Sequence, residues 1–162
     1  MIKKSIVFII LLYCFAIRAQ KEKVVLKTYT FSEIEILQQT KPKPVVAFIY
    51  TDWCKICFGM KKKTFQNLKV INLLNDRFYF IKLNAEHKKE IFFLGKKFKY
   101  KPNGSKTGIH ELAKELGTIN NKTSYPTTAF LSSKFESNLQ IDSYINSKKM
   151  ENILLKILQL KS

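Results

Sequence analysis

Two cysteines three residues apart are the part of this chain best suited to chemistry. Cys54 and Cys57 follow the apolar run Val45–Tyr50 and precede a Lys-rich run that can be helical. A continuous apolar run is typical of a strand buried on both faces. The pair therefore lies where a buried strand turns into a helix, and we expect Thr51 or Asp52 to cap that helix.

This position favours redox chemistry at the two sulfurs. An i,i+3 pair on a first helical turn brings its Cα atoms within the roughly 4.4–6.8 Å that a disulfide needs. The unpaired N–H groups and the dipole of the helix N-terminus stabilise a negative charge there. Because a thiolate is the nucleophile in disulfide exchange, the placement lowers the cost of activating Cys54.

A metal site is the other use of such a pair. Zinc needs four ligands, and the two histidines of the chain, His87 and His110, have no ligand spacing to the cysteines. We expect no zinc or iron–sulfur site, with His110 as a surface residue beside a helix and His87 in polar sequence after a strand. A soft ion held between the two thiolates alone stays open as an alternative.

The sequence around the pair resembles the active site of the thioredoxin superfamily, in which Trp-Cys-x-x-Cys follows a buried strand. Trp53 supplies the tryptophan. Three more stretches are similar to that family in the same order, namely its central strand, its cis-proline loop and its capped C-terminal helix: Phe80–Asn84, Ser124–Leu131 and Tyr144–Leu160. The resemblance covers Val45 to Leu160.

The resemblance implies an α/β thioredoxin fold, with a central mixed sheet of about four to five strands flanked by helices. It implies thiol–disulfide exchange by Cys54 and Cys57 with no further cofactor. It also implies that Trp53, Tyr125 and Pro126 shape the substrate groove and that the Tyr125–Pro126 bond is cis. Since proline has no N–H, a cis bond there presents the Tyr125 backbone to a substrate strand.

Two positions depart from the family pattern. Many thioredoxins carry a buried acid six residues before the first cysteine, where this chain has Phe48. Lys82 matches the lysine that accompanies that acid in the family. Because the acid is missing here, water or Lys82 is left to carry the proton of Cys57. Lys55-Ile56 replaces the usual Gly-Pro, and the Lys55 cation beside Cys54 favours the thiolate.

The remaining elements follow from hydrophobic period and turn residues. We expect strands at Val24–Tyr29, Arg77–Leu83, Thr127–Leu131 and Asn138–Asp142, and helices at Phe31–Gln39, Cys54–Asn67, Leu68–Asn75 and Ile145–Leu160.

The segment 84–122 is longer than the fold requires, and we interpret it as an insertion before the cis-proline loop. We expect it to hold a hairpin of Glu90–Leu94 with Lys97–Lys101, a helix at Ile109–Leu116 that ends at Gly117, and a polar loop at Thr118–Thr123. Its length predicts that it borders the active site and helps to select the client.

The first residues read as a secretory signal peptide. Lys3-Lys4 is a positive region, Ser5–Phe15 is apolar, and Ala19 offers a cleavage site. We therefore expect a signal peptide at 1–19, one thioredoxin-like domain at 20–162, and a periplasmic or secreted protein. An uncleaved anchor is the alternative; a lipid on Cys14 is disfavoured because Tyr13 is too bulky.

The chain is strongly basic, with a formal charge of +17. Without Lys3, Lys4 and Arg18, 26 of the 29 basic residues remain against 12 acidic residues. The net charge of the mature chain is then about +14. Base and phosphate recognition favours arginine, and this chain has only Arg18 and Arg77. We expect no nucleic-acid partner, and we leave open a weak association with anionic membranes.

These observations favour an exported thiol–disulfide oxidoreductase whose partners are protein thiols or disulfides and a redox partner. The alternatives are a thioredoxin-like module that binds partners without turnover and a soft-metal chaperone. After removal of residues 1–19 the chain has no cysteines other than Cys54 and Cys57, so the pair does not belong to a disulfide scaffold.

Overall fold

The computed structural model describes residues 24–104 and 107–160, so the expected signal peptide and its cleavage site lie outside the described part. A mixed four-stranded sheet in the order β10-β9-β1-β2 forms its centre. The strands are β1 (Val45–Tyr50), β2 (Tyr79–Asn84), β9 (Thr127–Leu131) and β10 (Ser137–Ile141). β1 pairs with β2 in parallel and with β9 antiparallel, and β9 pairs antiparallel with β10.

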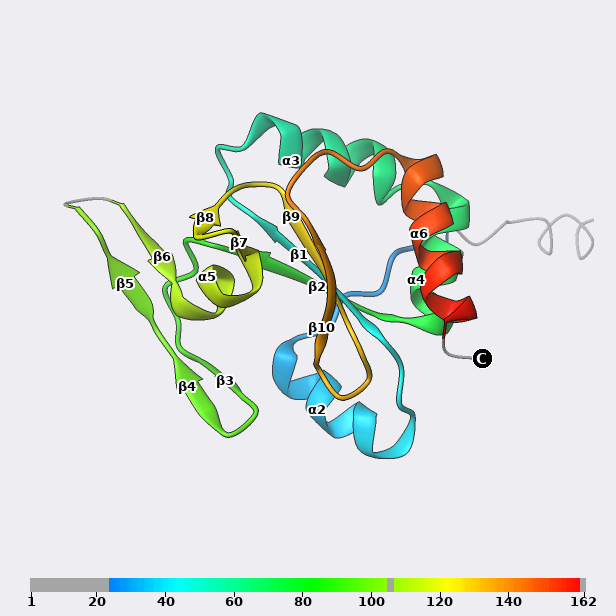
Figure 1. The fold of residues 1–162 in the computed structure, drawn as a ribbon, viewed down its shortest axis with the longest axis horizontal. Coiled ribbons are helices and arrows are strands. Elements are labelled where there is room, and N and C mark those ends of the chain that lie inside the picture. Colours follow the sequence, from blue (N-terminus) through cyan, green and yellow to red (C-terminus); the bar gives the residue numbers. More distant parts are fainter. Residues whose placement is uncertain (1–23, 105–106, 161–162) are drawn as a thin grey trace, which may run out of the picture.

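Helices cover both faces of this sheet (Figure 1). α3 (Lys55–Gly59) continues as a π-helical segment, η1 (Met60–Thr64), and lies on one face with α4 (Leu68–Arg77) and α6 (Ser147–Gln159). α2 (Phe31–Thr40) and α5 (Glu111–Gly117) cover the other. The predicted thioredoxin fold is confirmed.

The sequence of β1 explains its central place. Successive side chains of a strand point to opposite faces, and here Val46 and Phe48 enter the core under α3 and α6. Val45, Ala47 and Ile49 enter the core under α2 and α5. A strand buried on both faces must be apolar throughout, as this run is.

The segment 84–122 contains more β structure than the sequence predicted. The expected hairpin is present as β3 (Ile91–Phe93) and β4 (Lys96–Phe98), joined by a turn at Leu94-Gly95 in which both residues have positive φ. A second hairpin pairs β5 (Tyr100–Pro102) with β6 (Gly108–His110). The stretch expected as a polar loop forms a third, β7 (Thr118–Ile119) with β8 (Lys122–Thr123).

The strand predicted at Val24–Tyr29 is absent. Within the described residues, the backbone of this segment makes one backbone–backbone hydrogen bond, from Tyr29 N–H to the Phe80 carbonyl. Asn75 on α4 binds it instead: its Oδ1 accepts from Lys27 N–H and its Nδ2 donates to the Val25 carbonyl. Hydrogen bonds to the Asn75 side chain on α4 take the place of the strand pairing that the β-branched residues of this segment had predicted.

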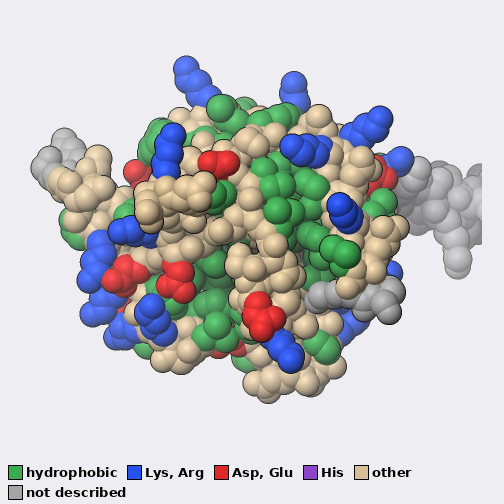
Figure 2. Space-filling model, viewed as in Figure 1, with side chains coloured by type: hydrophobic (Ala, Val, Ile, Leu, Met, Phe, Trp, Pro, Cys, Tyr) green, Lys and Arg blue, Asp and Glu red, His purple; other side chains and the backbone are tan. Residues whose placement is uncertain are grey.

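Lysines are distributed over the surface. Figure 2 shows them spread around one face rather than gathered in a single patch. Among the described residues, no helix combines the length and apolar character needed to cross a bilayer.

Candidate active site

The two cysteines form a disulfide at the start of α3. Their Cα atoms are 5.2 Å apart. Cys54 is itself the N-cap of the helix, because its Sγ accepts from the Cys57 backbone N–H at 3.1 Å. The expectation that Thr51 or Asp52 caps the helix is therefore wrong. The path of the chain after β1 places the Cys54 sulfur, rather than a side-chain oxygen of Thr51 or Asp52, opposite the free Cys57 N–H.

The pair is almost entirely covered. Cys57 is 0% exposed, and Cys54 retains 8% of its surface. The small accessible surface of the pair therefore belongs to Cys54. A partner that reaches the pair meets Cys54 first.

Trp53 and Tyr125 border the disulfide. Trp53 is 66% exposed, and its ring meets Tyr125 edge-on with centroids 6.0 Å apart. Tyr125 packs against the cluster that holds both cysteines, and the Tyr125–Pro126 bond is cis, as the family resemblance implied. Cys54, Cys57, Trp53, Tyr125 and Pro126 therefore come together from two distant stretches of chain.

Glu86 is a residue of this site that the sequence did not single out. Its Oε1 accepts a hydrogen bond from Trp53 Nε1 at 3.1 Å. Burial raises the pKa of the Tyr125 phenol, and the charge of Glu86 raises it further. The only sequence signal was that Glu86 follows the end of β2, at the same sheet edge as the cysteines.

Asp52 holds the loop before the cysteines. Its Oδ2 accepts from Asn84 Nδ2 at 2.8 Å, and its Oδ1 lies 3.9 Å from the Lys61 ammonium. Lys61 also lies over the Tyr50 ring at 3.5 Å. Burial lowers the pKa of Lys61, Asp52 opposes this, and Lys82 adds to it.

The two departures from the family pattern have clear structural settings. Phe48 is 0% exposed and packs on Tyr50 and Phe65, so an apolar ring fills the place of the family's acid. Lys82 is an exposed residue of β2 that lines a hollow together with Lys61. Lys55 is exposed at the first position of α3.

The expectation that His110 is a surface residue is wrong. It is 0% exposed and caps α5, with Nδ1 accepting from Leu112 N–H at 3.3 Å. Nε2 therefore carries the proton and donates to the Lys89 carbonyl at 3.2 Å. Burial is the main cause that lowers its pKa. The ring of His87 lies 6.0 Å away, and in the described residues no group of three or more metal-binding side chains converges.

Comparison with known proteins agrees with the geometry. The chain matches the family model of thioredoxin-like domains over residues 31–158 and belongs to that family. No curated protein sequence matches. The fold and the cysteine pair together are those of a thiol–disulfide oxidoreductase in the general sense.

Solved structures show the same fold at low sequence identity. DsbH oxidoreductase is 14% identical with a TM-score of 0.59, over 84% of this chain and 86% of that one. A thioredoxin from Thermus thermophilus is 18% identical with a TM-score of 0.58, over 82% and 87%. A thioredoxin-fold protein from Helicobacter pylori is 17% identical with a TM-score of 0.58, over 88% and 81%.

Proposed function

We propose that this protein exchanges thiols and disulfides with protein substrates in the cell envelope, using Cys54 as the attacking thiol and Cys57 as the resolving thiol. The observation that carries the proposal is the disulfide on the first turn of α3, in which Cys54 keeps a small accessible surface and Cys57 keeps none. The exposed Trp53 and the half-buried Tyr125, which precedes the buried cis-Pro126, offer a surface on which an extended polypeptide can lie.

In the reductive direction, the Cys54 thiolate attacks one sulfur of a substrate disulfide. The substrate S–S bond breaks, a mixed disulfide forms on Cys54, and the released substrate thiolate takes a proton. The Cys57 thiolate then attacks Cys54 Sγ, which frees the second substrate thiol and forms the Cys54–Cys57 bond. Oxidation of a substrate dithiol is the reverse sequence, and the cysteine pair is the only redox group that either direction requires.

Two features support stabilisation of the Cys54 thiolate. The Cys57 N–H already points at Cys54 Sγ, and a hydrogen bond to a charged form favours that form. Lys55 adds a cation at the next position. Both act on the sulfur that a substrate would meet first.

The location in the cell envelope rests on the N-terminal sequence, with its Lys3-Lys4 pair, apolar run and Ala19. We expect the exported protein to begin at Gln20. Mass spectrometry of the protein recovered from its native compartment tests this, and a mass that retains residues 1–19 would indicate an anchored protein.

Client trapping tests the catalytic proposal. Cys57→Ala removes the resolving thiol, so mixed disulfides on Cys54 should accumulate in cells and disappear on reduction. The Cys54→Ala/Cys57→Ala double variant is the matched control and should trap nothing. A pair that stays oxidised and yields no adduct would favour the binding module. Soft metal bound to anaerobically purified protein would favour the metallochaperone.

A further inference from the structure

A cavity of about 530 Å³ lies between the extended N-terminal segment and the helix that carries the cysteines. One wall is Val24–Leu26 with Thr28, and the other runs from Phe58 through Phe65 to Ile71. Its volume falls in the roughly 300–1,000 Å³ range of small-molecule sites. No part of the proposed exchange chemistry uses this cavity.

The cavity exists because residues 24–29 do not complete the sheet. The bonds of Asn75 to Val25 and Lys27 hold the segment against α4. These bonds keep residues 24–29 opposite η1, and the cavity lies between this segment and η1.

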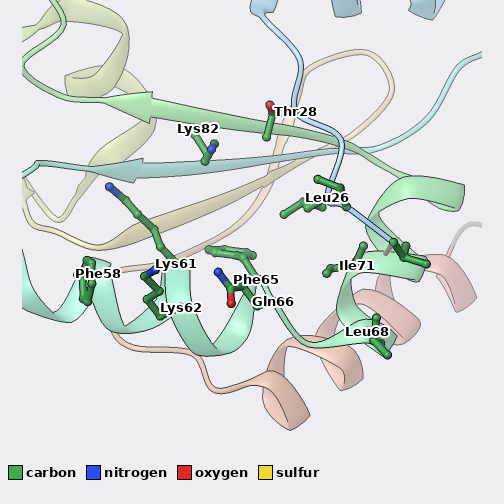
Figure 3. A pocket seen from close by; sticks show the side chains of 12 residues that line it. Leu26, Thr28, Phe58, Lys61, Lys62, Phe65, Gln66, Leu68, Ile71 and Lys82 are labelled. Atoms are coloured by element: carbon green, nitrogen blue, oxygen red, sulfur yellow. The ribbon is translucent and has the colours of Figure 1, made fainter. Parts of the chain in front are cut away.

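The lining has two chemical ends, as Figure 3 shows. Lys61, Lys62 and Lys82 gather at one end, and Leu26, Leu68 and Ile71 lie at the other, with Phe65 between them. Among the residues that the structure describes, the lining contains no aspartate or glutamate. An apolar cavity whose charged groups are all cationic complements a molecule with an apolar chain and an anionic head.

Few acidic groups face the lysines at the charged end. The Lys61 ammonium lies 3.5 Å from the centroid of the Tyr50 ring and the Lys62 ammonium lies 5.7 Å from that of Phe58, but these ring contacts do not neutralise the charges. Asp52 lies 3.9 Å from the Lys61 ammonium, at the limit of an ion pair. Within the described part of the chain, Lys82 makes no ion pair or hydrogen bond through its ammonium group. Lys61 and Lys82 repel each other, and Lys61 is partly buried. An anion placed between them removes this repulsion and gains two charge-assisted contacts.

We infer that this cavity binds an anionic amphiphile, an alkyl carboxylate whose head group lies between Lys61 and Lys82 and whose chain follows Phe65, Leu26 and Ile71. The site is separate from the disulfide and needs neither cysteine. Its occupant is a small molecule, because the volume of about 530 Å³ is that of a small-molecule site.

Calorimetric titration with dodecanoate below its micellar concentration tests the inference on the purified protein. One dodecanoate should bind per chain. Dodecanol, which lacks the charge, and butyrate, which lacks the chain, should each bind about tenfold more weakly or worse. The Cys54→Ser/Cys57→Ser variant should bind dodecanoate as the parent does, which separates this site from the exchange reaction.

Variants locate the head group. Lys61→Gln/Lys82→Gln should weaken dodecanoate binding about tenfold and leave dodecanol binding unchanged. Lys148→Gln/Lys149→Gln on α6 removes the same charge away from the cavity and should change neither. Leu26→Ser should weaken both ligands. If the double variant does not fold, Lys82→Gln alone replaces it, since Lys82 is exposed.

Three results would overturn the inference. The first is that dodecanoate binds the parent and the Lys61→Gln/Lys82→Gln variant with equal affinity. The second is that several dodecanoates bind per chain without saturation. The third is that no dodecanoate binds up to millimolar concentration. Binding to anionic vesicles without binding of monomeric dodecanoate would also overturn it, in favour of a membrane-surface contact.

Discussion

At the scale of single residues, the site depends on side chains that hold other side chains in place. Glu86 touches neither sulfur, yet it accepts the Trp53 indole N–H and lies near Tyr125. Asn84 likewise holds Asp52 in place, because its Nδ2 donates a hydrogen bond to the Asp52 carboxylate. Asn84 is the last residue of β2 and Glu86 follows two residues later, so the end of this strand fixes the loop that follows its neighbour β1.

Glu86 variants should separate hydrogen bonding from charge. Trp53 is the only tryptophan, so the fluorescence of the protein reports on the surroundings of this one indole. Glu86→Gln keeps an acceptor and should preserve the emission, whereas Glu86→Ala should shift it. Both should lower the pKa of Tyr125, because each removes the charge that raises it. The loss of stability should stay below about 1 kcal/mol.

The pKa of Tyr125 can be followed by NMR of isotope-labelled tyrosine, with Tyr125→Phe to assign the signal. An unchanged Tyr125 titration in both variants would show that Glu86 does not act on the phenol. Identical emission of the Ala and Gln variants would show that the indole bond has no influence on Trp53.

His110 should make stability depend on pH. Its pKa is lowered by burial from an ordinary value of 6.5, so the unfolded state binds more protons below that pH. The free energy of unfolding should therefore fall as pH drops from about 6.5 towards 5, above the range in which the carboxylates titrate. His110→Asn keeps an N-cap acceptor and should flatten this slope, at a cost of about 1–3 kcal/mol for the lost Lys89 bond.

Urea denaturation at several pH values measures the effect. His87→Gln is the matched control, because it leaves His110 and both of its hydrogen bonds in place. We expect that control to keep the slope. A slope that survives in His110→Asn would assign the pH dependence to other groups.

At the scale of elements, the segment 84–122 is packed into the domain rather than appended to it. Phe93 of β3 is 4% exposed and lies against Phe31 of α2, with centroids 4.8 Å apart, and against Phe135, at 4.9 Å. Leu94 N–H donates to Glu35 on the same helix. The hairpin β3–β4 therefore helps to cover one face of the sheet.

Phe93→Ala should cost about 3–5 kcal/mol, the usual range for emptying a buried aromatic position. Its neighbour Phe92 points outward and is 57% exposed, so Phe92→Ala should stay within about 0.5 kcal/mol of the parent. Denaturant unfolding of the two variants compares them directly. Equal losses would mean that the hairpin does not pack as the structure describes.

At the scale of the whole molecule, the reduction potential of the Cys54–Cys57 pair depends on the nearby charges and on the burial of the pair. Lys55 and the start of α3 favour the Cys54 thiolate, and Phe48 removes an acid that would oppose it. Burial of the pair acts in the opposite direction. We expect the charges to dominate, which stabilises the reduced form and makes the disulfide more oxidising than the roughly −270 mV of thioredoxin.

Equilibration in glutathione buffers measures this potential. Lys55→Ala should make the potential more negative by about 6–20 mV, since an exposed charge at a helix terminus contributes about 0.3–1 kcal/mol and 30 mV equals about 1.4 kcal/mol. Lys63→Ala, an exposed lysine further along the same helical stretch, is the control and should leave the potential unchanged. A parent value at or below −270 mV would reject the prediction and point to a reductase.

Features that depend on local pattern could be predicted from the amino-acid sequence alone. The apolar run of β1, the i,i+3 cysteines and the amphipathic C-terminal helix were predictable because strand burial and helical period are written in neighbouring residues. β9 was predicted with the bounds that the structure shows, Thr127–Leu131. The cis bond at Pro126 followed from resemblance to a family rather than from spacing.

Only the tertiary structure decided which groups meet across the chain. Residues 24–29 have strand-forming side chains, but bonds to Asn75 outweigh a ladder with β2. His110 was expected on the surface beside a helix, but it is buried where β6 meets α5, with its backbone N–H bound to the Ala85 carbonyl and its ring to the Lys89 carbonyl. Glu86 and Trp53 are 33 residues apart and meet because β1 and β2 are parallel neighbours. Each of these outcomes depends on contacts between distant segments, which local propensity and periodicity do not encode.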